Sequence, residues 1–276
     1  MGDAKLTGLD GKVAVVTGAG RMRSIGRPIA VDLAAAGCKI VLTGTGRDPS
    51  RYPDDEKAAG WGDIGSVLEE VEAAGSEGLA VVSDVRDPAA IEALADQTLE
   101  RFGRVDFVIN NAGAARGEDR KAVTEVDIDV WRNVLETNLV GTFLMSRTFG
   151  QRLIAQDEGG VIINMSSIAG KALPPNASAY SSSKAGIQAL TACMAQEVGK
   201  HGIRVNAICP GIIDTFRMDD IGRGETWDKL IKTRIPLQRP GQGSDISAMT
   251  LFLCSDQGSW LTGQSINVDG GTVVQH

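Results

Sequence analysis

One stretch near the N-terminus decides the fold: Lys12-Val13-Ala14-Val15-Val16-Thr17-Gly18-Ala19-Gly20-Arg21-Met22-Arg23-Ser24-Ile25-Gly26. Its first six residues predict a buried strand, which Gly18 ends. The residues from Arg27 to Ala36 predict a helix that ends at Gly37. A glycine-rich turn between a first strand and a first helix is the usual phosphate-binding position of an open α/β sheet, because glycine lets the backbone approach and the helix N-terminus attracts anions.

The same alternation of apolar runs and helical segments continues along the chain. Further strands are predicted at Lys39–Thr43, Leu79–Val82, Val105–Ile109, Val161–Met165, Ile203–Ile208 and Ser265–Val268. Asp87 can cap the helix that follows the third strand, with Pro88 in its first turn. Continuous apolar strands separated by helices predict a parallel sheet that is covered on both faces. We therefore expect one doubly wound, Rossmann-type α/β domain over residues 1–276, with about seven strands and helices on both faces.

Composition and charge exclude several classes of protein. The net charge is −7 without a basic run, which argues against a nucleic-acid partner. Four scattered cysteines without a Cys-x-x-Cys, and only two histidines, offer neither a metal site nor a Ser-His-Asp hydrolase. No run approaches about 18 apolar residues, and the N-terminus lacks the apolar core of a signal peptide. We expect a cytoplasmic protein with reduced thiols, no metal and no membrane partner.

One connection is longer than the others. Residues 44–65 contain Pro49, Pro53 and the charged run Asp54-Asp55-Glu56-Lys57, and a helix is predicted to restart at Ser66, where Ser66-Val67-Leu68-Glu69 has the form of a capping box. Connections of this length are more often surface elaborations than sites, so we expect residues 44–65 to be a surface insertion.

Tyr180 and Lys184 lie four residues apart, thirteen residues after Ser167. The segment from Ala177 to about Val198 predicts a helix, on which these two side chains share a face. A free tyrosine has a pKa near ~10, and lowering it to ~7 takes roughly 4 kcal/mol of preference for the phenolate. The neighbouring ammonium is the obvious source of that preference. Alone, such a pair is more often an exposed helix contact, and the surrounding motifs are what favour a catalytic tyrosine.

The end of the second predicted strand bears on the choice of nucleotide. NAD sites usually place a carboxylate there to hold the ribose 2′-hydroxyl, whereas this segment reads Leu42-Thr43-Gly44-Thr45-Gly46-Arg47, with no acid before Asp48. A small, uncharged end around Thr45, with Arg47 beside it and Arg21 in the glycine turn, suits a 2′-phosphate. We therefore favour NADP(H) over NAD(H). The alternative is that both arginines are solvated and NAD binds without a carboxylate.

Several motifs, in order, resemble the short-chain dehydrogenase/reductase family over most of the chain, from about Gly11 to Gly271. They are the Thr17-Gly18 turn, Asp84-Val85, Asn110-Asn111-Ala112-Gly113, Asn138, Ser167, Tyr180-x-x-x-Lys184, and Pro210-Gly211 with Thr215. Within the family, the sequence most resembles the 3-oxoacyl-carrier-protein-reductase-like branch. Reductases of unrelated ketones are often given the same name.

The resemblance implies a role for each catalytic candidate. Tyr180 would be the general acid in reduction and the general base in oxidation. Lys184 would lower the pKa of Tyr180 and hold the nicotinamide ribose. Ser167 would bond the substrate carbonyl and stabilise developing oxyanion character. Asn138 would hold a water that continues the proton relay from Lys184.

The resemblance also implies the contacts of the cofactor. Asp84 and Val85 would contact the adenine, Asn111 would line the cofactor channel, and Ile213 and Thr215 would meet the nicotinamide carboxamide. The glycine turn would hold the phosphates through Gly18, Gly20, Arg21, Ser24 and Ile25.

The glycine turn departs from the family pattern. Gly18 and Gly26 are eight residues apart instead of six, and Ser24 stands where the middle glycine would be. This spacing resembles the divergent enoyl-reductase branch, which, however, separates its tyrosine and lysine by six residues instead of three. The spacing of Tyr180 and Lys184 favours carbonyl chemistry.

We therefore expect hydride transfer between NADP(H) and a ketone, an aldehyde or a secondary alcohol. The alternatives are an enoyl or imine reductase and a non-catalytic nucleotide-binding protein. Residues 213–240 mix apolar and charged side chains after a strand end, and we interpret them as a substrate loop or lid; ordinary packed helix is nearly as good an interpretation. The apolar helices around residues 130–154 and 179–198 resemble those that pair in family oligomers, so we expect a homotetramer. The substrate is a small molecule that the sequence does not identify, and it is silent on the direction of the reaction.

Overall fold

The computed structural model describes residues 5–274, and the remaining ends of the expected 1–276 domain, residues 1–4 and 275–276, lie outside the described part. Within it, the strands form one seven-stranded sheet in the order β3-β2-β1-β4-β5-β6-β7. Every neighbouring pair is parallel. The predicted doubly wound α/β fold is therefore confirmed.

The strands are β1 (Val13–Thr17), β2 (Lys39–Gly44), β3 (Gly78–Val82), β4 (Phe107–Asn110), β5 (Gly160–Met165), β6 (Ile203–Pro210) and β7 (Ser265–Val268). The helices are α1 (Gly26–Ala35), α2 (Asp54–Ala58), α3 (Ile64–Ala73), α4 (Pro88–Phe102), α5 (Ile128–Leu135), α6 (Gly141–Gln156), α7 (Ala169–Ala172), α8 (Ser178–Val198), α9 (Glu225–Arg234) and α10 (Gly243–Cys254). Short 3-10 turns lie at Pro49–Arg51, Gly199–His201, Phe216–Ile221 and Asp256–Gly258, and a π turn lies at Glu136–Val140.

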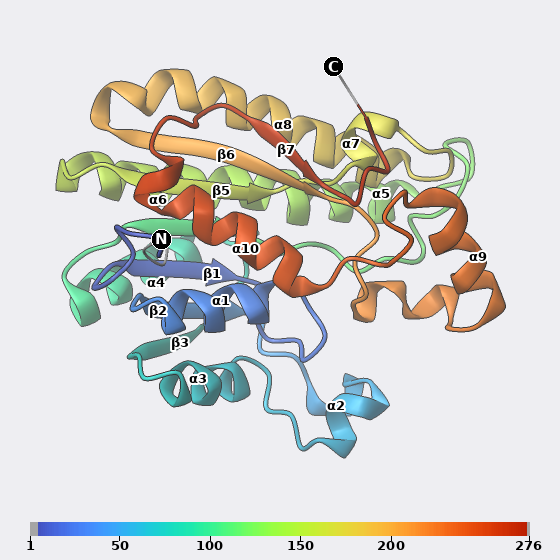
Figure 1. Ribbon diagram of the computed structural model, residues 1–276, viewed down its shortest axis with the longest axis horizontal. Helices are drawn as coiled ribbons and strands as arrows, with labels where there is room; N and C mark the ends of the chain where they lie inside the picture. Colours follow the sequence, from blue (N-terminus) through green and yellow to red (C-terminus); the bar gives the residue numbers. More distant parts are fainter. Residues whose placement is uncertain (1–4, 275–276) are drawn as a thin grey trace.

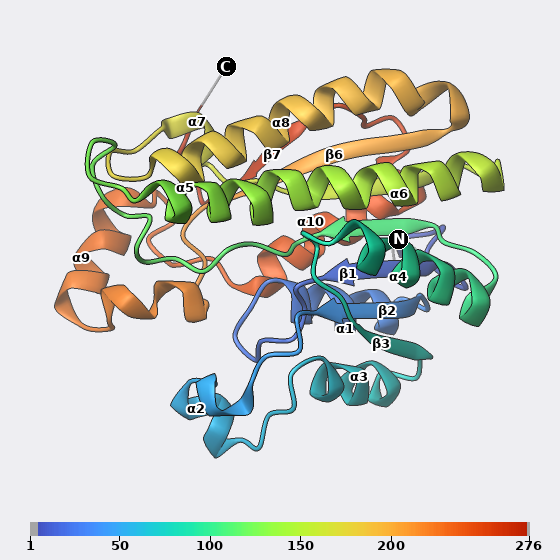
Figure 2. The same cartoon turned by 180° about the vertical axis from the view of Figure 1, so that it is seen from behind.

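The sheet has a hydrophobic core on each face, because successive residues of a strand point to opposite sides. In β1, Ala14 and Val16 belong to the core under α1, α3 and α10, which lie in front of the sheet in Figure 1. Val13 and Val15 belong to the core under α4, α6 and α8, which face the viewer in Figure 2. Burial on both faces explains why the strands read as continuous apolar runs.

Local signals at two helix starts had different outcomes. Asp87 caps α4 as predicted, since its carboxylate accepts the Ala89 N–H at 2.9 Å. The capping box at Ser66 is wrong, because α3 begins at Ile64, and the Ser66 hydroxyl accepts a hydrogen bond from the Gly62 N–H instead. The residue before α3, Asp63, has a φ of 58° and uses its carboxylate elsewhere, so it leaves this helix without a side-chain cap.

The strand ends place the functional residues. Strand order changes direction between β1 and β4, and ligands of doubly wound sheets bind beyond the carboxyl ends of the strands at such a point. Figures 1 and 2 both show α2 and α9 at the end of the sheet toward which β1 points. These two helices come from the long connections at 44–65 and 213–240.

Candidate active site

A cavity of about 610 Å³ opens at the carboxyl ends of the strands. Its walls include Gly18 from the glycine turn, Asp84 after β3, Asn111 after β4, Ser167 after β5 and Thr215 after β6. Tyr180 and Lys184 line the same cavity, so the nucleotide-binding motifs and the predicted catalytic pair share one space.

Helix α8 brings Tyr180 and Lys184 together as their spacing predicts. The Lys184 Nζ lies 5.7 Å from the centre of the Tyr180 ring. Lys184 is buried and its Nζ donates to the Met165 carbonyl at the end of β5 at 2.6 Å. Ser167 is also buried, two residues beyond that carbonyl, and its Oγ accepts the Ala169 N–H at 3.1 Å. The ammonium is thus fixed by the sheet and not free to move toward solvent.

The surroundings of Tyr180 favour its phenolate. Burial opposes ionisation, but the positive charges of Arg217 and Lys184, and then the Ser167 hydroxyl and Arg120, outweigh it and hold the pKa of Tyr180 below its usual value. Burial also lowers the pKa of Lys184, against the attraction of the phenolate. Ionisation of the two groups is therefore coupled.

Two of these cations, Arg120 and Arg217, were missed by the sequence analysis. The Arg120 guanidinium lies 4.5 Å from the centre of the Tyr180 ring, and the Arg217 guanidinium lies 5.0 Å from it. Neither lies at helical spacing from Tyr180, so no local pattern links the three residues. The signal that could have found Arg217 is its place two residues after Thr215, within the segment expected to reach the substrate.

Asn138 lies in the π turn that interrupts the helical run between α5 and α6. It is fully buried, its Oδ1 accepts the Ala114 N–H at 2.8 Å and its Nδ2 donates to the Ser183 hydroxyl at 3.0 Å. Single π turns are frequent at functional sites because they turn one residue out of register. Here Asn138 links the loop after β4, through Ala114, to Ser183 of α8, three residues after Tyr180.

The two outer glycines of the first turn are required by close packing. Gly18 has a φ of 64°, and a Cβ on it would lie 2.7 Å from the Cα of Ala112. A Cβ on Gly26 would lie 2.6 Å from the side-chain amide nitrogen, Nδ2, of Asn111. That amide donates to the Thr17 carbonyl at 2.8 Å, so it ties the turn to the end of β4 while lining the cavity.

The middle of this turn is held by the connection at 44–65. The Trp61 indole N–H donates to the Gly20 carbonyl at 2.6 Å, and the Met22 N–H donates to Glu56 at 2.9 Å. The Ser24 hydroxyl donates to the Arg21 carbonyl at 2.9 Å and accepts the Arg27 N–H, in the first turn of α1, at 3.2 Å. The interpretation of residues 44–65 as a surface insertion did not anticipate this role, nor that Asp63 lines the cavity; Arg47, predicted to bind the cofactor, lines it as well.

Arg47 is already engaged by two acids. Its guanidinium lies 2.7 Å from Glu56 and 3.1 Å from Asp63, and it stacks 4.5 Å from the centre of the Tyr52 ring. Burial opposes the charge of Arg47, but the two carboxylates raise its pKa. Asp63 is a cavity-lining carboxylate near the end of β2 that the sequence appeared to lack. The long connection returns it there sixteen residues after Arg47, beyond the range of a local motif.

Arg21 is the freer of the two arginines. Its guanidinium lies 4.0 Å from the centre of the Phe216 ring, and its Nη1 is buried without a hydrogen-bond partner in the described part of the chain. Burial and the nearby charge of Arg47 lower the pKa of Arg21. An additional anion at this position would relieve both effects.

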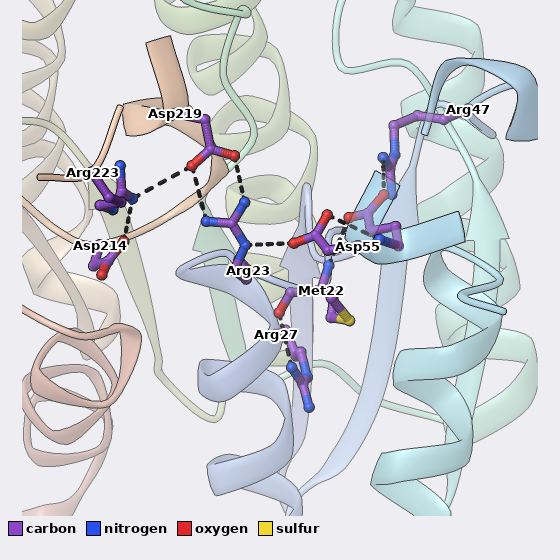
Figure 3. Close-up of polar contacts among 9 residues, drawn as sticks. Met22, Arg23, Arg27, Arg47, Asp55, Asp214, Asp219 and Arg223 are labelled. Carbon is purple, nitrogen blue, oxygen red and sulfur yellow. Dashed lines mark hydrogen bonds and ion pairs between the residues drawn. The ribbon is translucent and has the colours of Figure 1, made fainter. Parts of the chain in front are cut away.

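An ionic network joins the connection at 44–65 to the segment after β6. Arg23, in the glycine turn, lies between Asp55 of α2, at 2.6 Å, and Asp219, at 2.9 Å (Figure 3). Arg223 in turn pairs with Asp219 at 3.4 Å and with Asp214 (Figure 3). The glycine turn, the insertion and the predicted lid therefore contact one another across the cavity mouth.

The cavity fits a dinucleotide at its far end as well. Asp84, Val85 and Thr45 line it there, and Asp84 is held by Arg86 at 3.0 Å. The hydroxyls of Thr43 and Ser83, which also line the cavity, are buried with no hydrogen-bond partner in residues 5–274. Unpaired buried hydroxyls, a glycine turn and buried cations are the donor set that a nucleotide requires.

Other kinds of site have little support. Among the described residues, no group of three His, Cys, Asp or Glu side chains could hold a metal ion. No helix within residues 5–274 has the length and apolar character needed to cross a membrane.

Comparison with known proteins agrees with this geometry. The family described as "Enoyl-(Acyl carrier protein) reductase" matches residues 18–273. A 3-oxoacyl-[acyl-carrier-protein] reductase of Synechocystis sp. is 34% identical over 98% of this chain and 100% of its own. The 2-dehydro-3-deoxy-D-gluconate 5-dehydrogenase of Escherichia coli is 35% identical over 97% of each chain. Carveol dehydrogenase from Mycobacterium avium, solved in complex with NAD, superposes with a TM-score of 0.87 at 27% identity, over 96% of this chain and 99% of that one.

Proposed function

Since this chain belongs to the short-chain dehydrogenase/reductase family, in the branch of the 3-oxoacyl-carrier-protein reductases, and is a nucleotide-dependent oxidoreductase of carbonyl and alcohol groups, we propose that Tyr180 is its acid/base. The observation that carries the proposal is the place of Tyr180 beside Lys184 and Ser167, in the cavity that the glycine turn also lines. The pKa of Tyr180 is held below its usual value, which is the direction that proton exchange near neutral pH requires.

When bound, a nicotinamide cofactor would supply or accept the hydride. In reduction, Tyr180 gives its phenolic proton to the carbonyl oxygen as negative charge develops there. Ser167, fixed by the Ala169 N–H, donates a hydrogen bond to the same oxygen. Lys184, held by the Met165 carbonyl, stabilises the phenolate that remains, and it would also hold the ribose hydroxyls of the bound cofactor. In oxidation, Tyr180 takes the proton back.

The Asn138 side chain is bonded to Ala114 and Ser183, so we propose that it fixes the geometry around Tyr180. It would hold the relay water through the hydrogen bonds that its side chain can still form. Asn111, Ile213 and Thr215 would border the nicotinamide half of the cofactor, which is supported by their place in the cavity wall.

For the cofactor we propose NADP(H), with the 2′-phosphate beside Thr45 and Arg21. Arg21 carries most of this proposal, because Arg47 is already neutralised by Glu56 and Asp63. Gly18, Gly20, Ser24 and Ile25 would face the pyrophosphate, and Asp84 and Val85 the adenine. One observation favours NAD(H) instead: Asp63 offers a carboxylate to a 2′-hydroxyl.

Initial rates with NADPH and NADH decide between the two cofactors. The proposal expects a higher kcat/KM with NADPH, and a selective loss of the NADPH rate in Arg21→Leu. A preference for NADH that Asp63→Asn weakens would establish the second candidate.

A reductase of C=C or C=N bonds is the alternative chemistry, suggested by the spacing of Gly18 and Gly26 and by the name of the matching family. The separation of Tyr180 and Lys184 by three residues favours carbonyl substrates. Turnover of enoyl or imine substrates without turnover of ketones would support the alternative.

We propose that residues 213–240 form the lid. They pack mostly as a cluster of their own around Trp227, Ile231 and Ile235, with Ile213 in a main core, and Asp219 ties them to Arg23 of the glycine turn at the cavity mouth. Such a satellite cluster can move as a unit. Protection of this segment from hydrogen exchange on cofactor binding would test the lid.

We further propose a homotetramer formed through α5, α6 and α8, supported by the exposed side chains of Ile128, Phe143 and Ile154 on or beside these helices. Light scattering should then give four times the protomer mass. A cytoplasmic location is supported by the four free cysteines, of which Cys193 is exposed, and cell fractionation tests it.

A further inference from the structure

Two cations stand over the proposed acid/base, and the family-wide reaction does not account for both. Arg217 comes from the 3-10 turn Phe216–Ile221 and Arg120 from the loop before α5. Both guanidinium groups lie within 5.0 Å of the centre of the Tyr180 ring. Lys184 is already present to stabilise a phenolate, and the protein as a whole has a net charge of −7. Concentrated positive charge at this one place therefore needs a separate explanation.

The acids near Arg217 are already paired with other arginines. Asp214 and Asp219 bond Arg223, and Asp219 also bonds Arg23 (Figure 3). Asp220 pairs with Arg116. Arg217 itself is half-buried, and its one protein hydrogen bond in the described part of the chain goes to the uncharged Ala114 carbonyl.

Arg120 is only loosely compensated. Its Nε lies 3.4 Å from the buried Asp119 carboxylate, without hydrogen-bond geometry. Burial lowers the pKa of Arg120 against the opposing effect of Asp119. An arginine presents a fork of donors that suits a carboxylate, and Arg217, which lines the cavity, has no acidic partner for that fork in the described part of the chain.

The cofactor phosphates do not explain these two arginines. Arg21 and Arg23 belong to the glycine turn, where the phosphates would bind, whereas Arg217 and Arg120 face Tyr180. The group next to Tyr180 during the reaction is the substrate carbonyl, so the remaining candidate for an anion there is the substrate itself.

We propose that the substrate is a carbonyl or alcohol compound that carries a carboxylate close to the reacting carbon, and that Arg217 anchors this carboxylate, with Arg120 as the second cation. The inference rests on the proposed role of Tyr180, since that role places the reacting carbon beside the two arginines. Because Arg217 lies on the lid, binding of the carboxylate also couples substrate entry to lid closure. Arg217 is then a specificity-determining residue.

Matched acid and ester substrates test the proposal. Acetoacetate and methyl acetoacetate share the reacting ketone and differ in one charge. In the wild type the acid should have the higher kcat/KM. Arg217→Leu should lower kcat/KM for the acid about 10- to 100-fold, as expected for loss of a charged hydrogen-bond partner, mainly through KM. Because Arg217 also helps to hold the pKa of Tyr180 down, the ester rate should fall as well, but by a factor at least about tenfold smaller than the acid rate, so that the preference for the acid is lost. Arg217→Lys should restore part of the acid rate. Arg51→Leu, exposed in the connection at 44–65, is the control and should change neither substrate.

Two results would overturn the proposal. Equal losses on acid and ester in Arg217→Leu, with the pH profile of the ester displaced upward, would mean that Arg217 acts only on the pKa of Tyr180. A wild type that prefers the ester would exclude a carboxylate-binding role outright.

A binding experiment distinguishes failure of the carboxylate proposal from failure of the proposed reaction. Calorimetry of the protein saturated with oxidised cofactor compares 3-hydroxybutyrate with its methyl ester. The wild type should bind the acid but not the ester, and Arg217→Leu should bind neither. That result would support Arg217 as the carboxylate anchor even if neither acetoacetate nor its methyl ester turned over. Turnover that survives Tyr180→Phe would remove the proposed function while leaving this binding result intact.

Discussion

Replacement of Arg47 by leucine should destabilise the protein through the acids that it leaves behind. The Arg47 side chain is 17% exposed, and it lies between the carboxylates of Glu56, 1% exposed, and Asp63, 9% exposed. Removing one partner from a buried ion pair costs about 3–5 kcal/mol, because a buried charge is left uncompensated. Loss of the stacking on Tyr52 adds roughly 0.5–1 kcal/mol. We therefore expect the free energy of unfolding to fall by about 4 kcal/mol.

Urea denaturation followed by tryptophan fluorescence measures this loss, and thermal unfolding should show a melting temperature lower by roughly 8–16 °C. The matched control is Arg51→Leu, in the same connection but exposed, which should change stability by less than about 0.5 kcal/mol. Adding Glu56→Gln and Asp63→Asn to Arg47→Leu should recover at least half of the loss, because the triple variant buries no unpaired charge.

The reasoning is refuted if Arg47→Leu costs less than about 1 kcal/mol. It is also refuted if the neutral triple variant is no more stable than Arg47→Leu, since the loss would then come from packing alone. The first result would mean that Arg47 is available to the cofactor as a free cation.

Three further perturbations address the site. Tyr180→Phe should lower kcat by about 10²- to 10⁴-fold in both directions while the cofactor dissociation constant, measured by fluorescence, changes little; a residual rate above a tenth would contradict the acid/base role. In the wild type, kcat/KM for alcohol oxidation should rise with pH and level off above the pKa of Tyr180, at a pH below the ordinary tyrosine value of ~10, because oxidation needs the phenolate; a limb that rises only above that value would contradict the lowered pKa. Arg23→Gln should cost only about 0.5–1.5 kcal/mol of stability, since its ion pairs with Asp55 and Asp219 are about one-third exposed. It should raise the KM of the cofactor, and high salt should do the same in the wild type. An unchanged KM would mean that the network does not order the cavity mouth.

The sequence predicted the features that depend on short-range patterns. Continuous apolar runs identify the parallel strands to within about two residues at their ends. The spacing of Tyr180 and Lys184 predicts their shared face on α8, because helical neighbours are fixed by geometry alone. Asp87 and Pro88 mark the start of α4 for the same reason.

Contacts that depend on how a long connection returns were not predictable. Asp63 reaches the end of β2 only because the chain folds back through α2, and no local rule fixes that path. The cap at Ser66 failed because tertiary contacts of Asp63 moved the helix start to Ile64. Asn138 sits in a π turn, which has no sequence signature that separates it from a continuous helix.

Arg120 and Arg217 were missed for a related reason. Arg120 follows β4 and Arg217 follows β6, so the two are far apart in the sequence. Only the fold brings them to Tyr180. The resemblance to a family identified the parts of the site that members share. The charges that distinguish this site from others became visible only in three dimensions.

Transfer of deuterium from the cofactor tests the central claim most directly. Reduced cofactor carrying deuterium at the transferable position is incubated with a panel of keto acids, keto esters, cyclic ketones, aryl ketones and aldehydes, and the products are analysed by mass spectrometry. The account predicts one deuterium on the carbinol carbon, and an initial rate of label transfer at least about 100-fold lower in Tyr180→Phe that still binds cofactor. Label on a former C=C or C=N carbon, or cofactor binding with no labelled alcohol from any carbonyl in the panel, would contradict it.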